Sequence, residues 1–154
     1  MSRIAIFPGS FDPVTIGHVD IVKRSVDLFD KIIIGLGINS TKQTMFSAEQ
    51  RLEWLKNTFK NMSTVEVRSY EGLTVNFCKQ QSAKYILRGL RTSTDFQFEK
   101  AIAQMNQLLE EEIETVFILS SPQYSPVSST IVRDIIRHGG NVSQFLPENV
   151  KPKL

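Results

Sequence analysis

The sequence predicts an α/β fold in which helices cover both faces of an open, five-stranded parallel sheet. Short apolar runs alternate five times with segments of helical periodicity, as in chains whose strands are joined by crossover helices. The run Lys31–Ile38 is apolar on both alternate sets of its side chains, which is typical of a central parallel strand. With 154 residues, 41% of them hydrophobic, the chain can form one complete core. We therefore expect a single Rossmann-like domain over residues 1–154.

The first strand, helix and strand are expected within residues 3–38. The apolar run Arg3–Phe7 ends at Pro8 and Gly9, so it fits a buried strand that stops at a turn. From Gly17 to Phe29, valines and a phenylalanine recur at helical spacing and give one apolar face. The strand Lys31–Ile38 then completes a β-α-β unit.

The middle of the chain continues the alternation. Ser47 followed by Gln50 predicts a capping box, and the helix that it opens has an apolar stripe that ends at Phe59. The run Thr64–Arg68 alternates as a strand, and a short helix is expected from about Leu73 to Gln81.

The last third of the chain predicts two more strands and two helices. The strands are Tyr85–Gly89 and Thr115–Ser120, with a longer helix from about Thr94 to Leu109 between them. The final helix begins near Ser128 and stops at Gly139 and Gly140, which permit a left-handed turn. The longer helix carries an apolar stripe that consists of Phe98, Ile102, Met105 and Leu109.

The composition excludes several classes of protein. Eighteen basic and sixteen acidic residues give a net charge of +2, too small for a DNA-coating protein or a polybasic membrane anchor. We expect neither a nucleic acid nor a membrane as partner, since no apolar run approaches the roughly 20 residues of a membrane span. The one cysteine, Cys78, cannot form an internal disulfide, and the N-terminus lacks a signal run. A reducing cytoplasm is expected.

Hydroxyl, glycine and cationic side chains follow the predicted strands. The carboxyl ends of parallel strands share one edge of the sheet, so His18, Lys42, Arg88, Arg91 and the run Ser128–Thr130 can face one pocket. Backbone N–H groups and the positive end of a helix dipole favour anions, and helices are predicted to begin beside His18 and Ser128. This set predicts a polyphosphate site.

Each of these residues also has a simpler interpretation. A lone histidine near a helix start is commonly a surface or capping residue, and Ser128–Thr130 can merely cap a helix. Lys42 by itself is a solvated loop lysine, and Arg88 can form an ion pair instead of contacting a ligand. The other histidine, His138, is most simply a dipole partner at a helix C-terminus.

Several catalytic motifs are absent from the sequence. It has no G-x-x-x-x-G-K-[ST] loop and no G-x-G-x-x-G after the first strand. It also lacks a Cys or His pair at zinc spacing and a G-x-S-x-G elbow. We therefore expect no Walker-type hydrolysis, no acyl-enzyme and no protein-held metal.

Several motifs together resemble one known family. They are FPGSFDPVTIGHVDIV, MFSAEQR, ILRGLRTSTDFQFE, the pair MN, SSTIVR and FLPENV. The T-x-G-H and SST-x-x-R elements mark the nucleotidyltransferase superfamily, and RGLR followed by DFQFE and MN narrows the match. The chain resembles the phosphopantetheine adenylyltransferase family of coenzyme A synthesis over nearly its whole length.

The resemblance implies reversible transfer of an adenylyl group from ATP to 4′-phosphopantetheine, which gives dephospho-coenzyme A and pyrophosphate. Mg²⁺ would be carried with ATP, coenzyme A could bind as a feedback ligand, and a homohexamer is expected because the family is typically hexameric. The acceptor phosphate would attack the α-phosphate of ATP in line. Catalysis would then rest on positioning and charge stabilisation, without a protein nucleophile.

The resemblance also implies a role for individual residues. The catalytic residues would be His18, Lys42 and Arg91. The ATP-binding residues would be Ser10, Phe11, His18, Gly89, Leu90, Arg91, Glu99, Tyr124, Ser125, Pro126, Val127, Ser128, Ser129 and Thr130. The substrate-binding residues would be Ser10, Lys42, Thr74, Arg88, Met105 and Asn106.

Two assignments stay open at this stage, and two positions depart from the family pattern. Met105 can instead be a core residue, since it belongs to an apolar helical stripe. The protonation of His18 is undecided, because a helix start disfavours imidazolium and a triphosphate favours it. Thr15 stands where the wider superfamily often has a histidine, so His18 acts without a second histidine. Ser10 replaces a frequent threonine and keeps the hydroxyl.

Two other functions are compatible with parts of this pattern. A sister enzyme that uses nicotinate mononucleotide with ATP, or glycerol phosphate with CTP, would keep His18 and the Ser128–Thr130 run. The loops around Lys42, Thr74 and Arg88 favour phosphopantetheine over these acceptors. A non-catalytic nucleotide or coenzyme A sensor would also keep the fold, but it would have no reason to retain all the cations.

Overall fold

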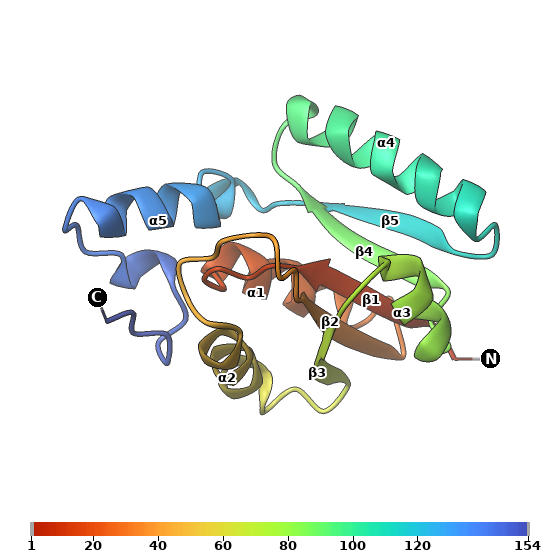
Figure 1. Ribbon diagram of the computed structural model, residues 1–154, viewed down its shortest axis with the longest axis horizontal. Coiled ribbons are helices and arrows are strands. Elements are labelled where there is room, and N and C mark those ends of the chain that lie inside the picture. Colours follow the sequence, from red (N-terminus) through yellow and green to blue (C-terminus); the bar gives the residue numbers. More distant parts are fainter. Residues whose placement is uncertain (1, 154) are drawn as a thin grey trace.

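The computed structural model describes residues 2–153 and contains one sheet of five parallel strands (Figure 1). The strands are β1 (Ile4–Gly9), β2 (Lys31–Gly37), β3 (Val65–Tyr70), β4 (Tyr85–Leu90) and β5 (Glu114–Leu119). Their order in the sheet is β3-β2-β1-β4-β5, so the direction of the connections reverses between β1 and β4. Open α/β sheets bind ligands at such a point. The predicted five-stranded parallel sheet is confirmed.

Helices cover both faces of the sheet. They are α1 (Ile16–Ser25), α2 (Ala48–Phe59), α3 (Thr74–Gln80), α4 (Ser93–Leu109) and α5 (Ser129–Arg137), with 3₁₀ turns at Pro122–Tyr124 and Ser143–Phe145. Helices α1, α2 and α5 pack on one face, α3 packs on the other, and α4 lies along β4 and β5 (Figure 1). Within residues 2–153, every helix is too short or too polar to cross a membrane.

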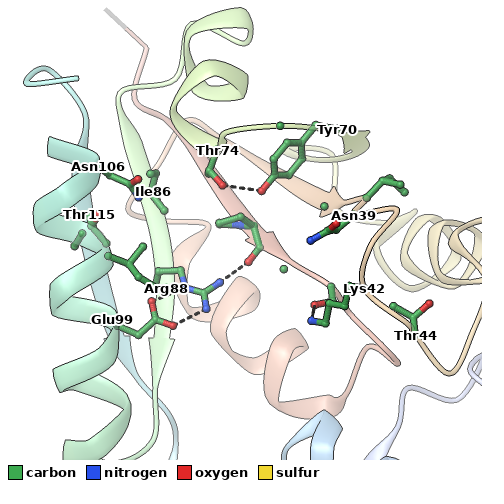
Figure 2. Close-up of a pocket in the computed structure, with 18 of the residues that line it drawn as sticks. Asn39, Lys42, Thr44, Tyr70, Thr74, Ile86, Arg88, Glu99, Asn106 and Thr115 are labelled. Carbon is green, nitrogen blue, oxygen red and sulfur yellow. Dashed lines mark hydrogen bonds and ion pairs between the residues drawn. The ribbon is translucent and has the colours of Figure 1, made fainter. Parts of the chain in front are cut away.

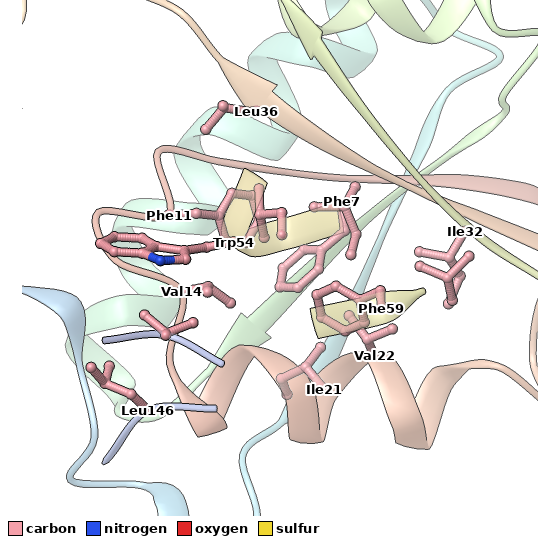
Figure 3. Close-up of a cluster of buried hydrophobic side chains, with 14 of the residues drawn as sticks. Phe7, Phe11, Val14, Ile21, Val22, Ile32, Leu36, Trp54, Phe59 and Leu146 are labelled. Carbon is pink, nitrogen blue, oxygen red and sulfur yellow. The ribbon is translucent and has the colours of Figure 1, made fainter. Parts of the chain in front are cut away.

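Alternate side chains of the central strands divide the core into two clusters. Phe7 of β1 and Ile32 of β2 join the larger cluster with α1, α2 and α5 (Figure 3). Their neighbours Ile6 and Ile33 point to the opposite face and pack with α3. Because both faces are covered, the run Lys31–Ile38 must be apolar on both sets of side chains.

Side-chain caps begin the three helices that border the sheet opening. The Thr15 hydroxyl accepts the backbone N–H of His18, and the Thr92 hydroxyl accepts that of Asp95. The side chains of His18 and Asp95 in turn accept the N–H of their capping residue, which closes a capping box in each helix. Ser128 caps α5 through its hydroxyl. The start of α1 therefore determines the orientation of the His18 ring.

The predicted end of β1 is wrong. The strand continues beyond Phe7 to Gly9, because β2 still pairs with Pro8 and Gly9. On its other side β1 pairs with β4 only through Ala5 and Ile6, so Pro8, which has no N–H, needs no ladder partner there. The sheet consequently opens between β1 and β4 at its carboxyl edge.

Two details of the predicted helices are also corrected. Helix α1 ends at Ser25 instead of Phe29, because the chain turns there and the Leu28 N–H bonds to the Ser25 carbonyl. Phe29 is still buried and packs on a core tyrosine ring. At α2 only half of the predicted capping box is present, in which the Ser47 hydroxyl accepts the Gln50 N–H.

The apolar stripe of α4 is left largely uncovered by the rest of residues 2–153. Phe98 is 68% exposed and Met105 is 59% exposed, and α4 has no buried residue. The helix touches the sheet only at its edge, along β4 and β5, so much of its surface points outward. The alternative that Met105 is a core residue is therefore wrong.

Candidate active site

Two cavities meet at the carboxyl edge of the sheet, where β1 and β4 separate. The smaller has a volume of about 350 Å³ and is bounded by β1, the β2–α2 loop, α3 and α4 (Figure 2). The larger has a volume of about 640 Å³ and is bounded by β1, α1, α4 and α5. Five residues line both cavities: Pro8, Gly9, Ser10, Arg88 and Glu99.

Polar groups from separate elements line the smaller cavity (Figure 2). Lys42 Nζ, in the β2–α2 loop, donates to Ser10 Oγ at 3.0 Å. Thr74, the first residue of α3, shares a hydrogen bond of 2.8 Å with the Tyr70 hydroxyl. Burial raises the pKa of Tyr70, which keeps that hydroxyl protonated. Asn106 adds an amide from α4, so on this side of the cavity Lys42 lies among neutral hydrogen-bonding groups.

Arg88 occupies the opening between β1 and β4. Its guanidinium donates twice to the Glu99 carboxylate, at 2.6 and 3.0 Å, and once to the Pro8 carbonyl that the sheet leaves unpaired. The Arg88 side chain is still 31% exposed. Of the two interpretations of Arg88, the structure shows the ion pair. Part of the Arg88 side chain also lines both cavities. The Arg88–Glu99 pair forms the wall between the two cavities.

Two helix starts and a second arginine face the larger cavity. His18 lies in the first turn of α1, and Ser128 caps α5. Arg91 follows β4, where Asp95 accepts its backbone N–H and lies 3.5 Å from its Nε. The positive ends of two helix dipoles and the Arg91 charge thus act on one volume. This arrangement favours an extended anion such as a polyphosphate.

The His18 ring has a defined tautomer. The Thr15 N–H donates to Nδ1 at 3.0 Å, so Nδ1 carries no proton and the neutral ring is protonated on Nε2. Burial of the ring, followed by the charges of Arg88 and Arg91, lowers the pKa of His18 from 6.5 to about 4. In the ligand-free protein at neutral pH, His18 is therefore an uncharged Nε2–H donor.

The tight turn after β1 brings Phe11 against His18. Phe11 has a φ of 45°, in the left-handed region, and its ring centroid lies 4.9 Å from that of His18 in an edge-on contact. A Cβ at Gly9 would lie 3.0 Å from the Phe11 ring. Glycine at this position therefore lets the ring support His18.

The one thiol lines neither cavity. Cys78, a residue of α3, is fully buried in the core, and burial raises its pKa to about 12. It therefore stays a neutral thiol in the physiological range. The groups that line the cavities are suited to binding, positioning and stabilising negative charge.

Most residues of the predicted site line these cavities. They are Ser10, Phe11, His18, Lys42, Thr74, Arg88, Gly89, Arg91, Glu99, Asn106, Val127, Ser128, Ser129 and Thr130. Those that line neither cavity are Leu90, Met105, Tyr124, Ser125 and Pro126. Tyr124 ends the 3₁₀ turn before α5, and Ser125 and Pro126 follow it. The binding roles of all five residues stay predictions.

Sequence reasoning missed two buried charged residues at the site. Asp12 lines the larger cavity and Arg51 lines the smaller one, and both side chains are buried. A signal for Arg51 was available, because it shares the apolar helical stripe with Trp54 and Leu55. A charge on such a stripe needs a buried partner.

Comparison with known proteins gives consistent matches. The family model described as cytidylyltransferase-like matches residues 6–135. The phosphopantetheine adenylyltransferase of Flavobacterium psychrophilum is 56% identical over 98% of this chain and 99% of its own. That of Christiangramia forsetii is 52% identical over 97% and 98%, and that of Leptospira biflexa is 48% identical over 100% and 96%.

A solved structure matches the fold. The crystal structure of a bifunctional NMN adenylyltransferase/ADP ribose pyrophosphatase from Francisella tularensis has a TM-score of 0.72 and 16% identity. The match covers 95% of this chain, which spans 45% of that one. The likeness is one of fold.

Proposed function

The chain belongs to the phosphopantetheine adenylyltransferase family, and on this premise we propose that it transfers an adenylyl group reversibly from ATP to 4′-phosphopantetheine. The products are dephospho-coenzyme A and pyrophosphate, in a step of coenzyme A biosynthesis. One observation carries the assignment of the site, namely that two cavities with anion-binding groups meet at Ser10 and Arg88. Two phosphate-bearing substrates can meet at such a junction.

The smaller cavity receives the acceptor. Lys42 and Arg88 bind its phosphate, and Thr74 and Asn106 contact the pantetheine arm. A phosphate oxygen of the acceptor attacks the α-phosphorus of ATP, so that a new P–O bond forms while the bond to the β-phosphate oxygen breaks. Pyrophosphate leaves in line. Ser10, which lines both cavities, lies where the two phosphates approach each other.

The larger cavity receives ATP. The Nε2–H of His18 donates to an α-phosphate oxygen as negative charge develops there, and a neutral donor that is already oriented costs no reorganisation in the transition state. Arg91 and the start of α5 bind the outgoing phosphates. Two hydrogen bonds from Arg88 to Glu99 hold Arg88 in the wall between the cavities. From that wall, Glu99 also contacts the nucleotide.

We propose that magnesium comes to this site as the complex with ATP. Within residues 2–153, no three His, Cys, Asp or Glu side chains are grouped so that they could hold a metal ion. Bound with the nucleotide, the ion would neutralise phosphate charge. Arg91 and the positive ends of the two helices would then balance the phosphate charge that the ion leaves.

A homohexamer in the cytoplasm is the assembly and location that we propose. The exposed stripe on α4, with Phe98 at 68% and Met105 at 59% exposure, is apolar surface that association can cover. A Phe98→Glu variant should lower the molar mass measured by light scattering. A variant that keeps a sixfold mass would show that α4 does not form the contacts that hold the assembly together.

Coenzyme A shares the pantetheine arm of the acceptor, so we expect coenzyme A to compete with phosphopantetheine at the smaller cavity.

Pyrophosphate release tests the proposed function directly. The purified protein is incubated with ATP and magnesium and with phosphopantetheine, nicotinate mononucleotide or glycerol phosphate as acceptor. Release with phosphopantetheine alone is expected. Release with another acceptor would move the substrate and keep the mechanism, whereas no release with any acceptor would favour a nucleotide or coenzyme A sensor.

A further inference from the structure

Two buried charges lie where the loop after β1 meets the loop after β2. Asp12 is 5% exposed and Arg51 is 4% exposed, and they are the only buried charged residues in the part of the chain that the structure describes. The first loop carries Ser10 and the second carries Lys42. Burial of a charge is costly unless hydrogen bonds satisfy it, so the partners of these two side chains are informative.

The Asp12 side chain bonds to the backbone of the second loop, and the Arg51 side chain bonds to the backbone of both loops. The Asp12 carboxylate accepts the N–H of Met45 at 2.8 Å and that of Phe46 at 3.0 Å. Arg51, in the first turn of α2, donates from its Nη1 to the Ser10 carbonyl at 2.7 Å and from its Nε to the Phe46 carbonyl at 3.1 Å. The two residues thus form a reciprocal clasp between the loops.

The clasp supplies nearly all the hydrogen bonds that hold the second loop. Within residues 39–46, every hydrogen bond to another part of the described chain goes to Asp12, to Arg51 or from Lys42 to Ser10. Lys42 itself is exposed on this loop. A long, exposed lysine has many rotamers, so the backbone beneath it must be held if its Nζ is to stay near Ser10.

We propose that Asp12 and Arg51 are positioning residues that hold Lys42 beside Ser10, at the place where the acceptor phosphate binds. The assignment of that phosphate rests on the proposed function. Asp12 and Arg51 act through the loop, not through contact with a reacting atom. The loop after β1 is also tied to α5, because Arg133 donates to the Asp12 carbonyl. The clasp therefore lies between the acceptor and nucleotide sides.

An Asp12→Asn substitution tests the clasp with little change in volume. One asparagine oxygen can still accept a backbone N–H, but the amide nitrogen faces the other donor. We expect the catalytic efficiency for phosphopantetheine to fall about tenfold, the weight of one charge-assisted hydrogen bond. Asp12 lines the larger cavity, but both hydrogen bonds of its carboxylate go to the loop that carries Lys42, so the KM for ATP should change less than about twofold. Ser25→Ala, which removes a buried hydrogen bond to the Ile21 carbonyl far from the loops, is the matched control.

A double-mutant cycle with Lys42→Ala separates positioning from general destabilisation. If Asp12 acts through Lys42, Asp12→Asn should lower efficiency less than about twofold once Lys42 is alanine. The full tenfold loss in both backgrounds, or an unchanged catalytic efficiency for the acceptor in the single variant, would overturn the proposal. An Arg51→Lys variant, which keeps the charge but cannot span both carbonyls, should behave like Asp12→Asn.

Hydrogen exchange tests the clasp independently of the reaction. The amides of Met45 and Phe46 should lose protection in Asp12→Asn and keep it in Ser25→Ala. Unchanged protection in Asp12→Asn refutes the clasp even if the enzyme is active. If wild-type protein releases no pyrophosphate with phosphopantetheine, the proposed function fails while the exchange result still decides whether the loops are clasped.

Discussion

Acidification is the most direct perturbation of the proposed catalytic donor. Thr15 donates its N–H to His18 Nδ1, and burial with the charges of Arg88 and Arg91 lowers the pKa of the ring to about 4. The prediction is that His18 in the ligand-free protein stays neutral, with its proton on Nε2, from pH 8 down to about pH 5. The Nε2–H donor should therefore stay in place when the pH falls by these three units.

The size of the effect follows from the change in pKa. Lowering the pKa of His18 from 6.5 to about 4 favours the neutral ring by roughly 3 kcal/mol, since one pKa unit corresponds to about 1.4 kcal/mol. Between these two values the unfolded chain binds more protons at this residue than the folded chain. The contribution to the free energy of unfolding is therefore complete above pH 6.5 and is lost as the pH falls towards 4.

Nuclear magnetic resonance can observe this ring directly. A His138→Gln variant leaves His18 as the only histidine, and long-range ¹H–¹⁵N spectra then report its tautomer and titration. Denaturant unfolding of His18→Asn and the parent at several pH values should give a difference that shrinks between pH 6.5 and 4. A midpoint near 6.5 would refute the lowered pKa, and a proton on Nδ1 at pH 7 would refute the tautomer.

Three further substitutions test the site and the core. His18→Ala should lower turnover about 10²- to 10³-fold with little change in ATP binding, because one preorganised donor is lost; single-turnover kinetics with an unchanged rate would remove His18 from the mechanism. Arg88→Ala should weaken phosphopantetheine binding measured by calorimetry, since a charge-assisted contact disappears, and equal affinity would contradict that role. Leu55→Ala, at a side chain with no exposure, should lower the free energy of unfolding by about 2–5 kcal/mol. The same change at Leu108, which is 81% exposed, should have an effect within about 0.5 kcal/mol.

Local sequence patterns predicted the elements and most of the cavity lining. The boundaries that failed depend on distant partners. β1 reaches Gly9 because β2 pairs with it there, and α1 ends at Ser25 because the chain must turn towards β2. Periodicity also showed an apolar stripe on α4, but it could not show that this chain leaves Phe98 and Met105 exposed. An apolar stripe indicates that a helix face needs to be covered, but it does not indicate which chain covers that face.

By itself the sequence determined the layered fold, the anion-binding character of the strand ends and the family, because periodicity, capping residues and motifs are properties of neighbouring residues. Only the tertiary structure decided that Arg88 pairs with Glu99 across the opening between β1 and β4. It also decided that His18 is a neutral donor and that Asp12 and Arg51 clasp two loops. Burial and electrostatic fields are sums over residues far apart in the chain, so these properties arise only when the chain is folded.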